Sequence, residues 1–272
     1  MRIIGVHQLF YPKFALFCNC VTNLQKSLMK ALILSAGLGT RLKPFTDNHP
    51  KALAPVNGRS LLEHNIRNLQ RFGIYDIVVN VHHFADQIIH TLKANEGFGS
   101  RFEISDESEG VLETGGGLKK AIPFFLEEKN ILILNVDILS NIDLARMLQQ
   151  HEQSQAMATL AVQKRNSSRY LLFREEQQHR RLCGWRNVAT EEEKLPCPAM
   201  SPSYEEYAFS GIQLVQQAFL HKISQQGKFS LIDVYLSLCC TESIMAWDHT
   251  GDLLLDVGKP ESLEQAATLF KN

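Results

Sequence analysis

The sequence predicts an α/β protein with a doubly wound, mostly parallel sheet and a smaller part made of mixed or antiparallel strands. Three short apolar runs, at residues 31–34, 76–82 and 130–137, have the character of buried parallel strands. Helical patterns follow the first two runs, and repeated alternation of strand and helix is typical of a doubly wound sheet. Beyond residue 151 the apolar runs at residues 156–162, 170–173 and 182–185 are short and strand-like, which indicates the mixed part.

The individual elements follow in chain order. The first helix is expected at residues 60–72, where apolar residues recur at helical spacing and Gly73 follows as a stop signal. Pro260 suits the first turn of a helix, so the last helix is expected to begin there. A charged stretch with prolines at residues 188–203 predicts a long loop. The remaining elements are expected at residues 85–92 (helix), 102–105 (a weak strand), 142–151 (helix), 156–162, 170–173, 182–185 and 207–215 (strands), 230–240 (helix), and 244–247 and 253–257 (strands).

A glycine-rich loop with two cations follows the first strand. Gly37 and Gly39 allow the backbone to adopt a positive φ and to approach a ligand without interference from a Cβ atom. Arg41 provides a planar, permanently charged fork for phosphate oxygens, and Lys51 follows after a loop with two prolines. A dinucleotide-binding fingerprint would need glycine where Leu42 stands, and the loop lacks the Gly-Lys-Ser/Thr of a Walker motif. The loop therefore predicts a phosphate site of another kind.

The full pattern of this loop, G-x-G-T-R-x-x-P-x-T-x-x-x-P-K, resembles the signature of the sugar-1-phosphate nucleotidyltransferases. Its fixed positions are filled by Gly37, Gly39, Thr40, Arg41, Pro44, Thr46, Pro50 and Lys51. The resemblance implies a Rossmann-like nucleotidyltransferase fold in which the mixed part binds the sugar. The residues then expected to bind the nucleoside triphosphate are Ala36, Gly37, Gly39 and Thr40. Arg41 and Lys51 are the expected catalytic residues: Arg41 holds the departing pyrophosphate, and Lys51 contacts phosphate at the reacting centre.

Two aspartates are candidates for holding Mg²⁺. Asp137 ends the third strand, at the edge where open α/β sheets bind ligands, although such a residue could equally cap the next turn. The resemblance implies that Asp137 binds the metal together with Asp256, which lies in a D-x-G sequence. A divalent metal is the usual means of stabilising charge on the α-phosphate and pyrophosphate. Two positions depart from the family pattern, since Val136 stands for a glycine and Lys259 for a threonine.

A second glycine-rich segment is expected beside the nucleobase. Thr114, Gly115, Gly116 and Gly117 form the pattern of an N-cap followed by a helix start whose free N–H groups can face a ligand. A purely structural role is the alternative, but it is less economical because three glycines destabilise a helix. In the family the matching segment lies along the base. Glu113 replaces its first glycine, a variant that looks most like the bacterial uridylyltransferases acting on N-acetylmuramic acid 1-phosphate in cell-wall recycling.

The residues leave the choice of base open. UTP with an amino-sugar 1-phosphate is favoured, with GTP and a mannose- or heptose-type 1-phosphate as the alternative and CTP with phosphocholine as a third. Glu113 could accept N–H bonds from guanine, or it could turn away to hold the glycine-rich backbone while main-chain groups read uracil. The second is favoured, because a buried carboxylate facing the oxygens of uracil would be repelled.

The sugar is expected on the side of the mixed part. In the family a glycine within an S/T-G-I/L strand contacts the sugar, and Gly211 matches it. Asn80 and His82 lie where the second strand opens toward the expected pocket, and His83 is adjacent. Each histidine could equally be a surface residue at a strand end.

The remaining features limit partners and location. A formal net charge of −1 gives no support for a nucleic-acid or membrane-surface partner, and no apolar run reaches the roughly 18 residues of a membrane span. The six cysteines show no C-x-x-C pair, so neither a zinc site nor a disulfide framework is expected, which fits a reducing cytoplasm. Residues 1–28 contain no Asp or Glu and are expected to be an N-terminal extension outside the fold. Residues 29–272 are then the nucleotidyltransferase domain, of unknown oligomeric state.

Together these features predict Mg²⁺-dependent transfer of a nucleotidyl group from a nucleoside triphosphate to a sugar 1-phosphate. A nucleotide-sugar-sensing regulatory subunit without turnover is the alternative from a different class. Loss of a catalytic cation or of a metal-binding aspartate would favour that alternative. Both cations and both aspartates are present.

Overall fold

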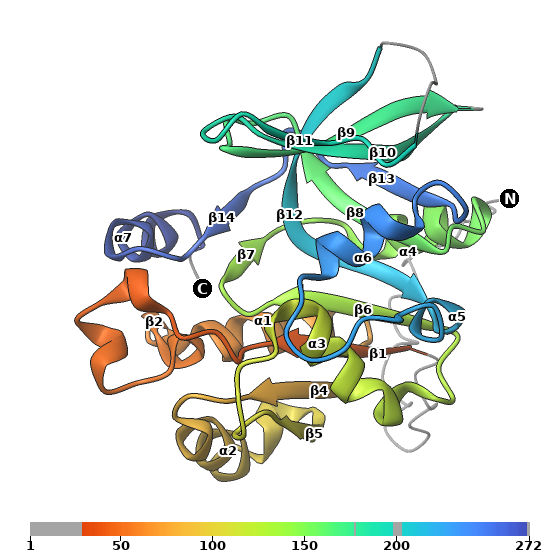
Figure 1. The fold of residues 1–272 in the computed structure, drawn as a ribbon. Coiled ribbons are helices and arrows are strands. Elements are labelled where there is room, and N and C mark those ends of the chain that lie inside the picture. The colour runs from red at the N-terminus through yellow and green to blue at the C-terminus, as the bar shows by residue number, and fades with distance from the viewer. Residues whose placement is uncertain (1–28, 177, 198–202, 271–272) are drawn as a thin grey trace, which may run out of the picture.

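The computed structural model describes residues 29–176, 178–197 and 203–270, and ten of its strands form one continuous sheet (Figure 1). The parallel half of this sheet has the strand order β5-β4-β1-β6. Its strands are β1 (Met29–Leu34), β4 (Asp76–Val81), β5 (Arg101–Asp106) and β6 (Asn130–Asn135). Because β1, β4 and β6 are buried on both faces, their sequences are nearly continuous apolar runs.

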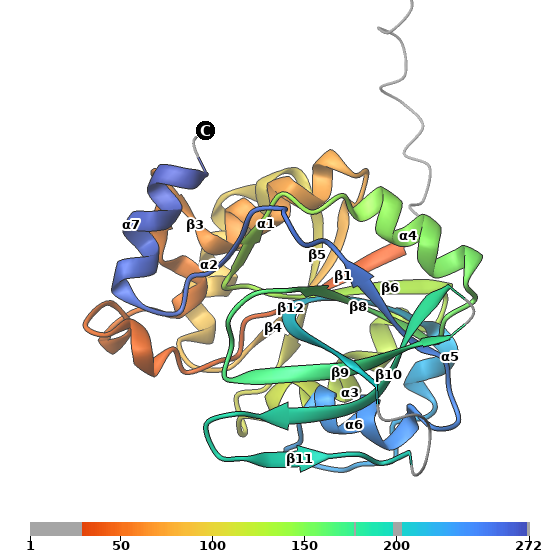
Figure 2. The same ribbon diagram turned by 90° about the horizontal axis from the view of Figure 1, so that it is seen from above.

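Helices cover both faces of the parallel half (Figure 2). One face is covered by α1 (Leu61–Arg71), α2 (Ala85–Ala94) and α4 (Leu144–Gln153), which share one hydrophobic core with the sheet. The other face is covered by α3 (Glu113–Ala121) and α6 (Leu231–Leu238), which share a second core. The predicted doubly wound α/β fold class is therefore confirmed.

The other half of the sheet is mixed. Its strands are β8 (Ala158–Gln163), β9 (Arg169–Glu176), β10 (His179–Asn187), β11 (Glu192–Lys194), β12 (Glu205–Gln216) and β13 (Ile244–Asp248). The long strand β12 joins the two halves, because it runs antiparallel to β6 on one side and to β8 and β9 on the other. β13 runs parallel to β8, and the pairings of β10 with β9, β11 and β13 are antiparallel.

A small two-stranded ribbon connects the end of the parallel half to the C-terminal segment. It consists of β7 (Ile138–Ser140) and β14 (Leu254–Asp256), which pair antiparallel with Asp256 opposite Ile138. The Val257 N–H donates to the Asp137 carbonyl at 2.8 Å. The ribbon therefore brings the two predicted metal ligands, which are far apart in the sequence, close together: Asp137 directly precedes β7, and Asp256 is the last residue of β14.

Short elements complete the described chain. A third, smaller core lies under the glycine-rich loop and contains buried side chains of that loop, of α1 and of α7. The remaining strands and α-helices are β2 (Pro55–Val56), β3 (Arg59–Ser60), α5 (Gln217–Leu220) and α7 (Pro260–Leu269). The 3₁₀ helices are Thr40–Leu42, Phe45–Asp47, Lys51–Leu53, Glu96–Gly99 and Ile122–Phe125.

Three expectations about the chain need correction or fall outside the structure. The third strand ends at Asn135, so Asp137 lies in the turn after it rather than at its last position. The predicted loop at residues 188–203 is wrong in part, because Glu192–Lys194 forms β11 on the edge of β10. Residues 1–28, predicted to be an extension, lie outside the described residues.

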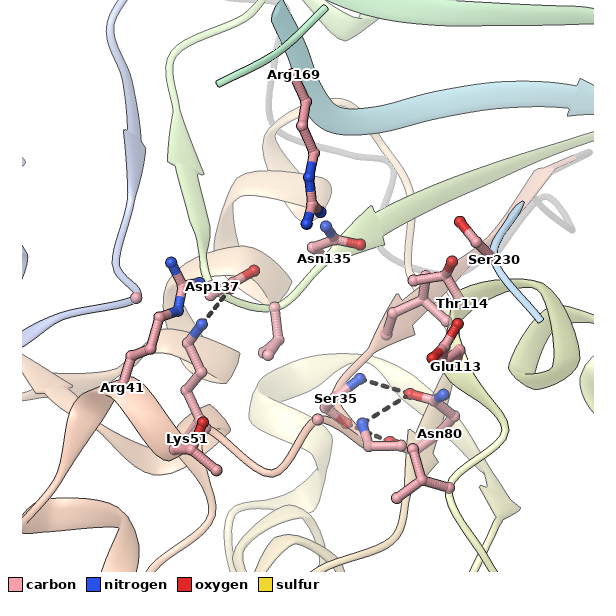
Figure 3. Close-up of a pocket in the computed structure, with 18 residues that line it drawn as sticks. Ser35, Arg41, Lys51, Asn80, Glu113, Thr114, Asn135, Asp137, Arg169 and Ser230 are labelled. Atoms are coloured by element: carbon pink, nitrogen blue, oxygen red, sulfur yellow. Dashed lines mark hydrogen bonds and ion pairs between the residues drawn. The ribbon is translucent and has the colours of Figure 1, made fainter. Parts of the chain in front are cut away.

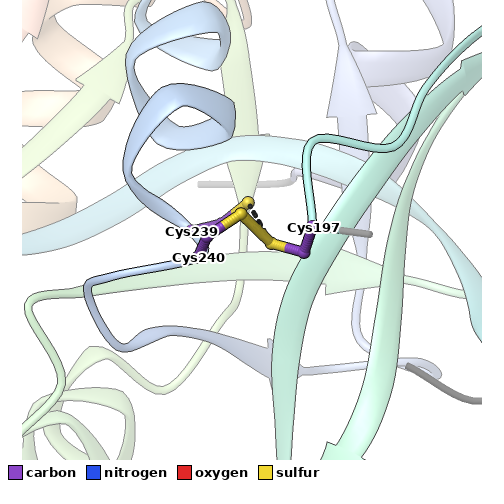
Figure 4. Close-up of side chains that lie close together, drawn as sticks. All are labelled: Cys197, Cys239 and Cys240. Carbon is purple, nitrogen blue, oxygen red and sulfur yellow. Dashed lines mark hydrogen bonds between the residues drawn. A yellow bond between two sulfur atoms is a disulfide. The ribbon is translucent and has the colours of Figure 1, made fainter. Parts of the chain in front are cut away.

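The cysteines also depart from the prediction. Cys197 and Cys240 form a disulfide, and the Sγ atom of Cys239 lies 3.6 Å from that of Cys197 (Figure 4). The expectation of no disulfide is therefore wrong for this pair. The two residues are separated by 43 positions and meet only because β11 lies beside the end of α6, so their sequence spacing carried no signal. In the described part of the chain, no helix has the length and apolar character needed to cross a membrane.

Candidate active site

A pocket of about 550 Å³ opens at the carboxyl ends of β1, β4 and β6 (Figure 3). Open α/β sheets bind their ligands at this edge. The predicted site residues that line it are Ala36, Gly37, Gly39, Thr40, Arg41, Lys51, Asn80, Glu113, Thr114 and Asp137. The predicted site residues that are not part of its wall are His82, Gly115, Gly116, Gly211 and Asp256. The structure thus brings residues of both glycine-rich segments and one of the two predicted metal ligands, Asp137, to a single cavity.

The first glycine-rich loop is folded back on itself. Gly39 has a φ of 63°, and a Cβ atom placed there would lie 2.9 Å from Thr46 Cγ2 and 3.0 Å from Lys51 Cβ. The Thr46 hydroxyl donates to the Gly39 carbonyl at 2.9 Å. At Gly37, by contrast, an added Cβ would meet no atom within 4 Å. Gly39 is therefore needed to close the loop, whereas Gly37 leaves space on the pocket side.

Two cations and two carboxylates meet beside this loop. Lys51 forms an ion pair with Asp137, and the two side chains are only 10% and 19% exposed. The Arg41 guanidinium approaches the Asp256 carboxylate with an Nη2–Oδ2 distance of 3.9 Å, and both are about half exposed or more. An added Cβ at Gly258 would lie 2.8 Å from both Arg41 Nη2 and Asp256 Oδ1, so a side chain there would displace the ends of these two side chains.

The donor set fits a divalent metal. Burial raises the pKa of the Asp256 carboxyl, and the negative charge of nearby Asp137 raises it further, while Lys51 and Arg41 oppose the shift. The two carboxylates therefore repel one another, and a cation bound between them would relieve that repulsion. Carboxylate oxygens are also the protein ligands that Mg²⁺ prefers.

Asn80 holds the end of β1 in place. Its side-chain oxygen accepts the N–H groups of Ser35 and Ala36, and its Nδ2 donates to Glu107 Oε1 at 2.7 Å. Glu107 is completely buried, and this burial raises the pKa of its carboxyl group. An added Cβ at Gly117 would lie 2.7 Å from Glu107 Oε1. Asn80 lines the pocket, but its amide is already engaged by the protein. No sequence pattern marked Glu107 as a buried support for it.

His82 is bonded to a carbonyl group of the protein and does not line the pocket. Its Nδ1 lies 2.7 Å from the carbonyl oxygen of Glu107, and His82 is not part of the pocket wall. The predicted sugar contact by His82 is therefore not supported by its position.

The second glycine-rich segment packs against the loop before α6. The N–H groups of Gly115 and Gly116 donate to the Phe229 carbonyl at 3.0 and 3.4 Å. The expectation of free N–H groups at these two glycines is therefore wrong. The Thr114 hydroxyl oxygen accepts the Leu231 N–H at 3.0 Å, which fastens the first turn of α6. Gly115 and Gly116 are buried and serve packing, whereas Thr114 also lines the pocket.

Glu113 adopts a conformation that usually belongs to glycine. Its φ is 59°, in the left-handed region that side chains other than glycine rarely occupy. Its carboxylate lies 3.6 Å from the Lys228 ammonium group and is about half exposed. The side chain therefore turns toward a protein cation rather than toward the glycine-rich backbone.

The side of the pocket where the sugar is predicted to bind is lined in part by residues that the sequence did not mark. Gly211 is buried with a φ of 72°, and an added Cβ would lie 3.0 Å from Asn135 Nδ2. Gly211 thus makes room for Asn135, which does line the pocket. Arg169, at the start of β9, and Ser230, the N-cap of α6, also line it. A polar residue at the end of a core strand, such as Asn135, is a signal that could have been used. Arg169 lay in an exposed, charged stretch with no signal of its own.

Comparison with known proteins identifies the family. Residues 30–272 match the nucleotidyl transferase family. The chain belongs to this family. The predicted resemblance is thus confirmed over almost the whole of the chain that the structure describes.

Similar members of the nucleotidyl transferase family include two bacterial enzymes named N-acetylmuramate alpha-1-phosphate uridylyltransferase. The protein from Caulobacter vibrioides is 44% identical over 109 residues, which covers 39% of this chain and 45% of that relative, less than half its length. The one from Neisseria meningitidis is 29% identical over 244 residues, which covers 89% of this chain and 98% of the relative. A solved structure from Bacillus anthracis, described as a glucose-1-phosphate thymidylyltransferase, has a TM-score of 0.72 at 17% identity, covers 90% and 98% of the two chains, and shows the same fold.

Proposed function

We propose that the protein transfers a nucleotidyl group from a nucleoside triphosphate, UTP by preference, to a sugar 1-phosphate and releases pyrophosphate. The observation that carries this proposal is that the two cations Arg41 and Lys51, which line the pocket with Asp137, each lie beside a carboxylate, that of Asp256 and that of Asp137. Transfer between phosphates needs cations for the phosphate oxygens and carboxylates for a divalent metal. The name of the Neisseria meningitidis relative, which aligns with 89% of the chain, supports UTP and an amino-sugar acceptor.

In this proposal the residues act by position and charge. Arg41 donates paired hydrogen bonds to the departing pyrophosphate, because its planar fork matches two phosphate oxygens. Lys51, held in place by its ion pair with Asp137, lies ready to contact the phosphate of the sugar. Asp137 and Asp256 would hold Mg²⁺, which when bound neutralises charge on the phosphate oxygens. An oxygen of the sugar phosphate attacks the α-phosphorus in line with the departing pyrophosphate, and no covalent enzyme intermediate is needed.

The choice of UTP rests on the direction of the Glu113 side chain. Because its carboxylate lies beside Lys228, main-chain groups near Thr114 are left to read the base. Uracil carries acceptor oxygens that a free carboxylate would repel. GTP with a mannose- or heptose-type 1-phosphate is the second candidate, since a Glu113 carboxylate released from Lys228 could accept N–H bonds from guanine.

The deciding experiment is a screen of pyrophosphate release. The four ribonucleoside triphosphates and dTTP are each combined with a panel of sugar 1-phosphates and with phosphocholine, at saturating Mg²⁺. We expect release with UTP and an amino-sugar 1-phosphate, and none when the metal is removed by a chelator. An Asp256→Asn variant serves as the inactive control. Nucleotide binding without release from any pair would instead favour the regulatory, non-catalytic alternative.

A further inference from the structure

Arg169 is a cation of the pocket whose guanidinium has no partner among the residues that the structure describes. Its side chain is exposed and extends into the pocket next to Asn135 (Figure 3). Across the described parts of the chain, its guanidinium makes no hydrogen bond or ion pair. The other two pocket cations are placed beside carboxylates, Lys51 in an ion pair and Arg41 at 3.9 Å from one. Arg169 is thus available for an anion that a ligand supplies.

The backbone holds Arg169 at a defined position. It is the first residue of β9, it lies opposite Asn187 of β10, and its N–H donates to Ser167 Oγ at 3.2 Å. The hydroxyl oxygen of Tyr170 accepts the Ser167 N–H at 2.9 Å, which fastens the loop before the strand. An arginine presented by a fixed backbone loses less freedom on binding than one on a mobile loop.

The same loop carries a second arginine with a different role. Arg165 donates from Nη2 to the Phe209 carbonyl at 3.0 Å. Burial lowers the pKa of its guanidinium, and the charge of nearby Asp256 acts in the opposite direction. Arg165 is therefore anchored near the carboxylates, whereas Arg169 extends into open space. The loop between β8 and β9 thus adds positive charge to the sugar side of the site.

We propose that Arg169 selects the acceptor by binding a carboxylate carried by the sugar, so that the substrate is an acidic sugar 1-phosphate. This inference rests on the proposed function, since it takes the pocket to accept a sugar 1-phosphate. The reacting phosphates already have Arg41 and Lys51, which enter the pocket from another wall (Figure 3). A guanidinium matches a carboxylate with two parallel, charge-assisted hydrogen bonds. A neutral sugar offers Arg169 no such partner.

The test compares two acceptors that differ in one carboxylate-bearing ether group, N-acetylmuramate 1-phosphate and N-acetylglucosamine 1-phosphate. Binding of each is measured by calorimetry with the full chain, Mg²⁺ and a UTP analogue whose α,β-bridge is an imido group. Arg169→Gln is expected to weaken binding of the acidic sugar about 10- to 100-fold and to leave the neutral sugar within about twofold. Arg169→Lys should retain an intermediate affinity. Arg146→Gln, which removes an exposed arginine of α4, is the matched control and should change neither.

Each other outcome overturns the inference. Equal weakening of both acceptors by Arg169→Gln would mean that Arg169 contacts the 1-phosphate they share. No weakening of either, or equal affinity of the unmodified protein for both, would mean that it does not select a carboxylate. If the Arg169 variants melt at the same temperature as the control Arg146→Gln, a folding defect is excluded.

Failure of this inference can be told from failure of the proposed function. Selective binding of the acidic sugar without pyrophosphate release from UTP would reject the catalytic proposal and keep the role of Arg169. Pyrophosphate release that is as efficient with neutral sugar 1-phosphates as with the acidic one would keep the catalytic proposal and reject the role of Arg169.

Discussion

The two glycine-rich segments border the same pocket and use glycine for opposite purposes. In the first, residues 36–41, a Cβ atom added at Gly37 would meet no atom within 4 Å. In the second, residues 113–117, an added Cβ would lie 2.4 Å from Phe229 Cδ2 at Gly115 and 2.4 Å from the Gly227 carbonyl oxygen at Gly116. The first segment therefore leaves space for a ligand at Gly37, although its Gly39 packs against Thr46 and Lys51, whereas Gly115 and Gly116 of the second segment both pack against protein.

The polar groups of the two segments differ in the same way. The first segment presents Arg41, which faces a carboxylate loosely and remains largely exposed. In the second, the N–H groups of Gly115 and Gly116 are bonded to the loop before α6, and the Thr114 hydroxyl is bonded to the first residue of that helix. A run of glycines therefore predicts that other atoms come close to the backbone, but it does not indicate whether those atoms belong to a ligand or to the protein. Only the surrounding atoms distinguish a ligand-binding turn from a packing interface.

The largest expected effect is a loss of turnover, and it tests whether the two carboxylates beside the first segment take part in catalysis. Asp137→Asn and Asp256→Asn keep the shape of the side chain but remove the charge that would hold Mg²⁺. Each should lower the turnover number for pyrophosphate release by roughly a hundredfold or more at saturating Mg²⁺. Retention of near-normal turnover in either variant would remove that residue from the site.

The same two variants should differ in stability. Asp137→Asn leaves the buried Lys51 ammonium without its charged partner, so the free energy of unfolding should fall by about 1–3 kcal/mol. The pKa of Asp256 is raised by burial and by Asp137, so the folded protein disfavours its ionised form. This loss of stability is present at pH values above the pKa that the carboxyl group has in the unfolded chain, and it disappears at lower pH, where the group is protonated in both states. Asp256→Asn should therefore keep or raise stability at neutral pH, as chemical denaturation would show.

The next prediction compares the two glycine-rich segments directly, by the effect of an added methyl group on stability and on nucleotide binding. Gly116→Ala places a methyl group against the Gly227 carbonyl, which is backbone and cannot move aside, so the free energy of unfolding should fall by about 1–3 kcal/mol. Gly37→Ala should change it by less than about 0.5 kcal/mol, because the space is open and its φ is not in the left-handed region. It should instead raise the Kd of the nucleotide, because its methyl group enters the ligand space. Thermal unfolding and nucleotide titration of both variants measure the contrast. A stable Gly116→Ala protein with weakened nucleotide binding would reverse the assignment.

The sequence predicted those parts of the site whose signal is local. The loop from Gly37 to Lys51 could be recognised because closing it requires particular residues within a short span. The fold class followed from apolar runs that alternate with helices, since strands buried on both faces have few polar residues. Asp137 was found because it follows such a run, although the strand stops two residues earlier.

Features that depend on distant parts of the chain could not be predicted. Asp137 and Asp256 meet because β7 and β14 pair, and Cys197 and Cys240 meet because β11 lies beside α6. Glycine spacing is the same for packing and for ligand binding, so Gly115 and Gly116 were assigned free N–H groups that they lack. Arg169 could not be picked out from the sequence, because the pocket that it lines is formed by residues that are far apart along the chain.

The smallest expected effect concerns the residue at the start of the second segment. A left-handed conformation costs residues other than glycine about 1–2 kcal/mol, so Glu113→Gly relieves strain that Glu113→Ala retains. Glycine also raises the entropy of the unfolded chain, which opposes this gain, so Glu113→Gly should stay within about 1 kcal/mol of the unmodified protein. Glu113→Ala keeps the strain of the unmodified protein and should have a similar stability. Because the carboxylate lies beside Lys228, both variants should change the ratio of kcat/KM for UTP and GTP by less than about fivefold. If the unmodified protein prefers GTP and Glu113→Gly abolishes that preference, the carboxylate reads guanine, and the second segment binds the ligand after all.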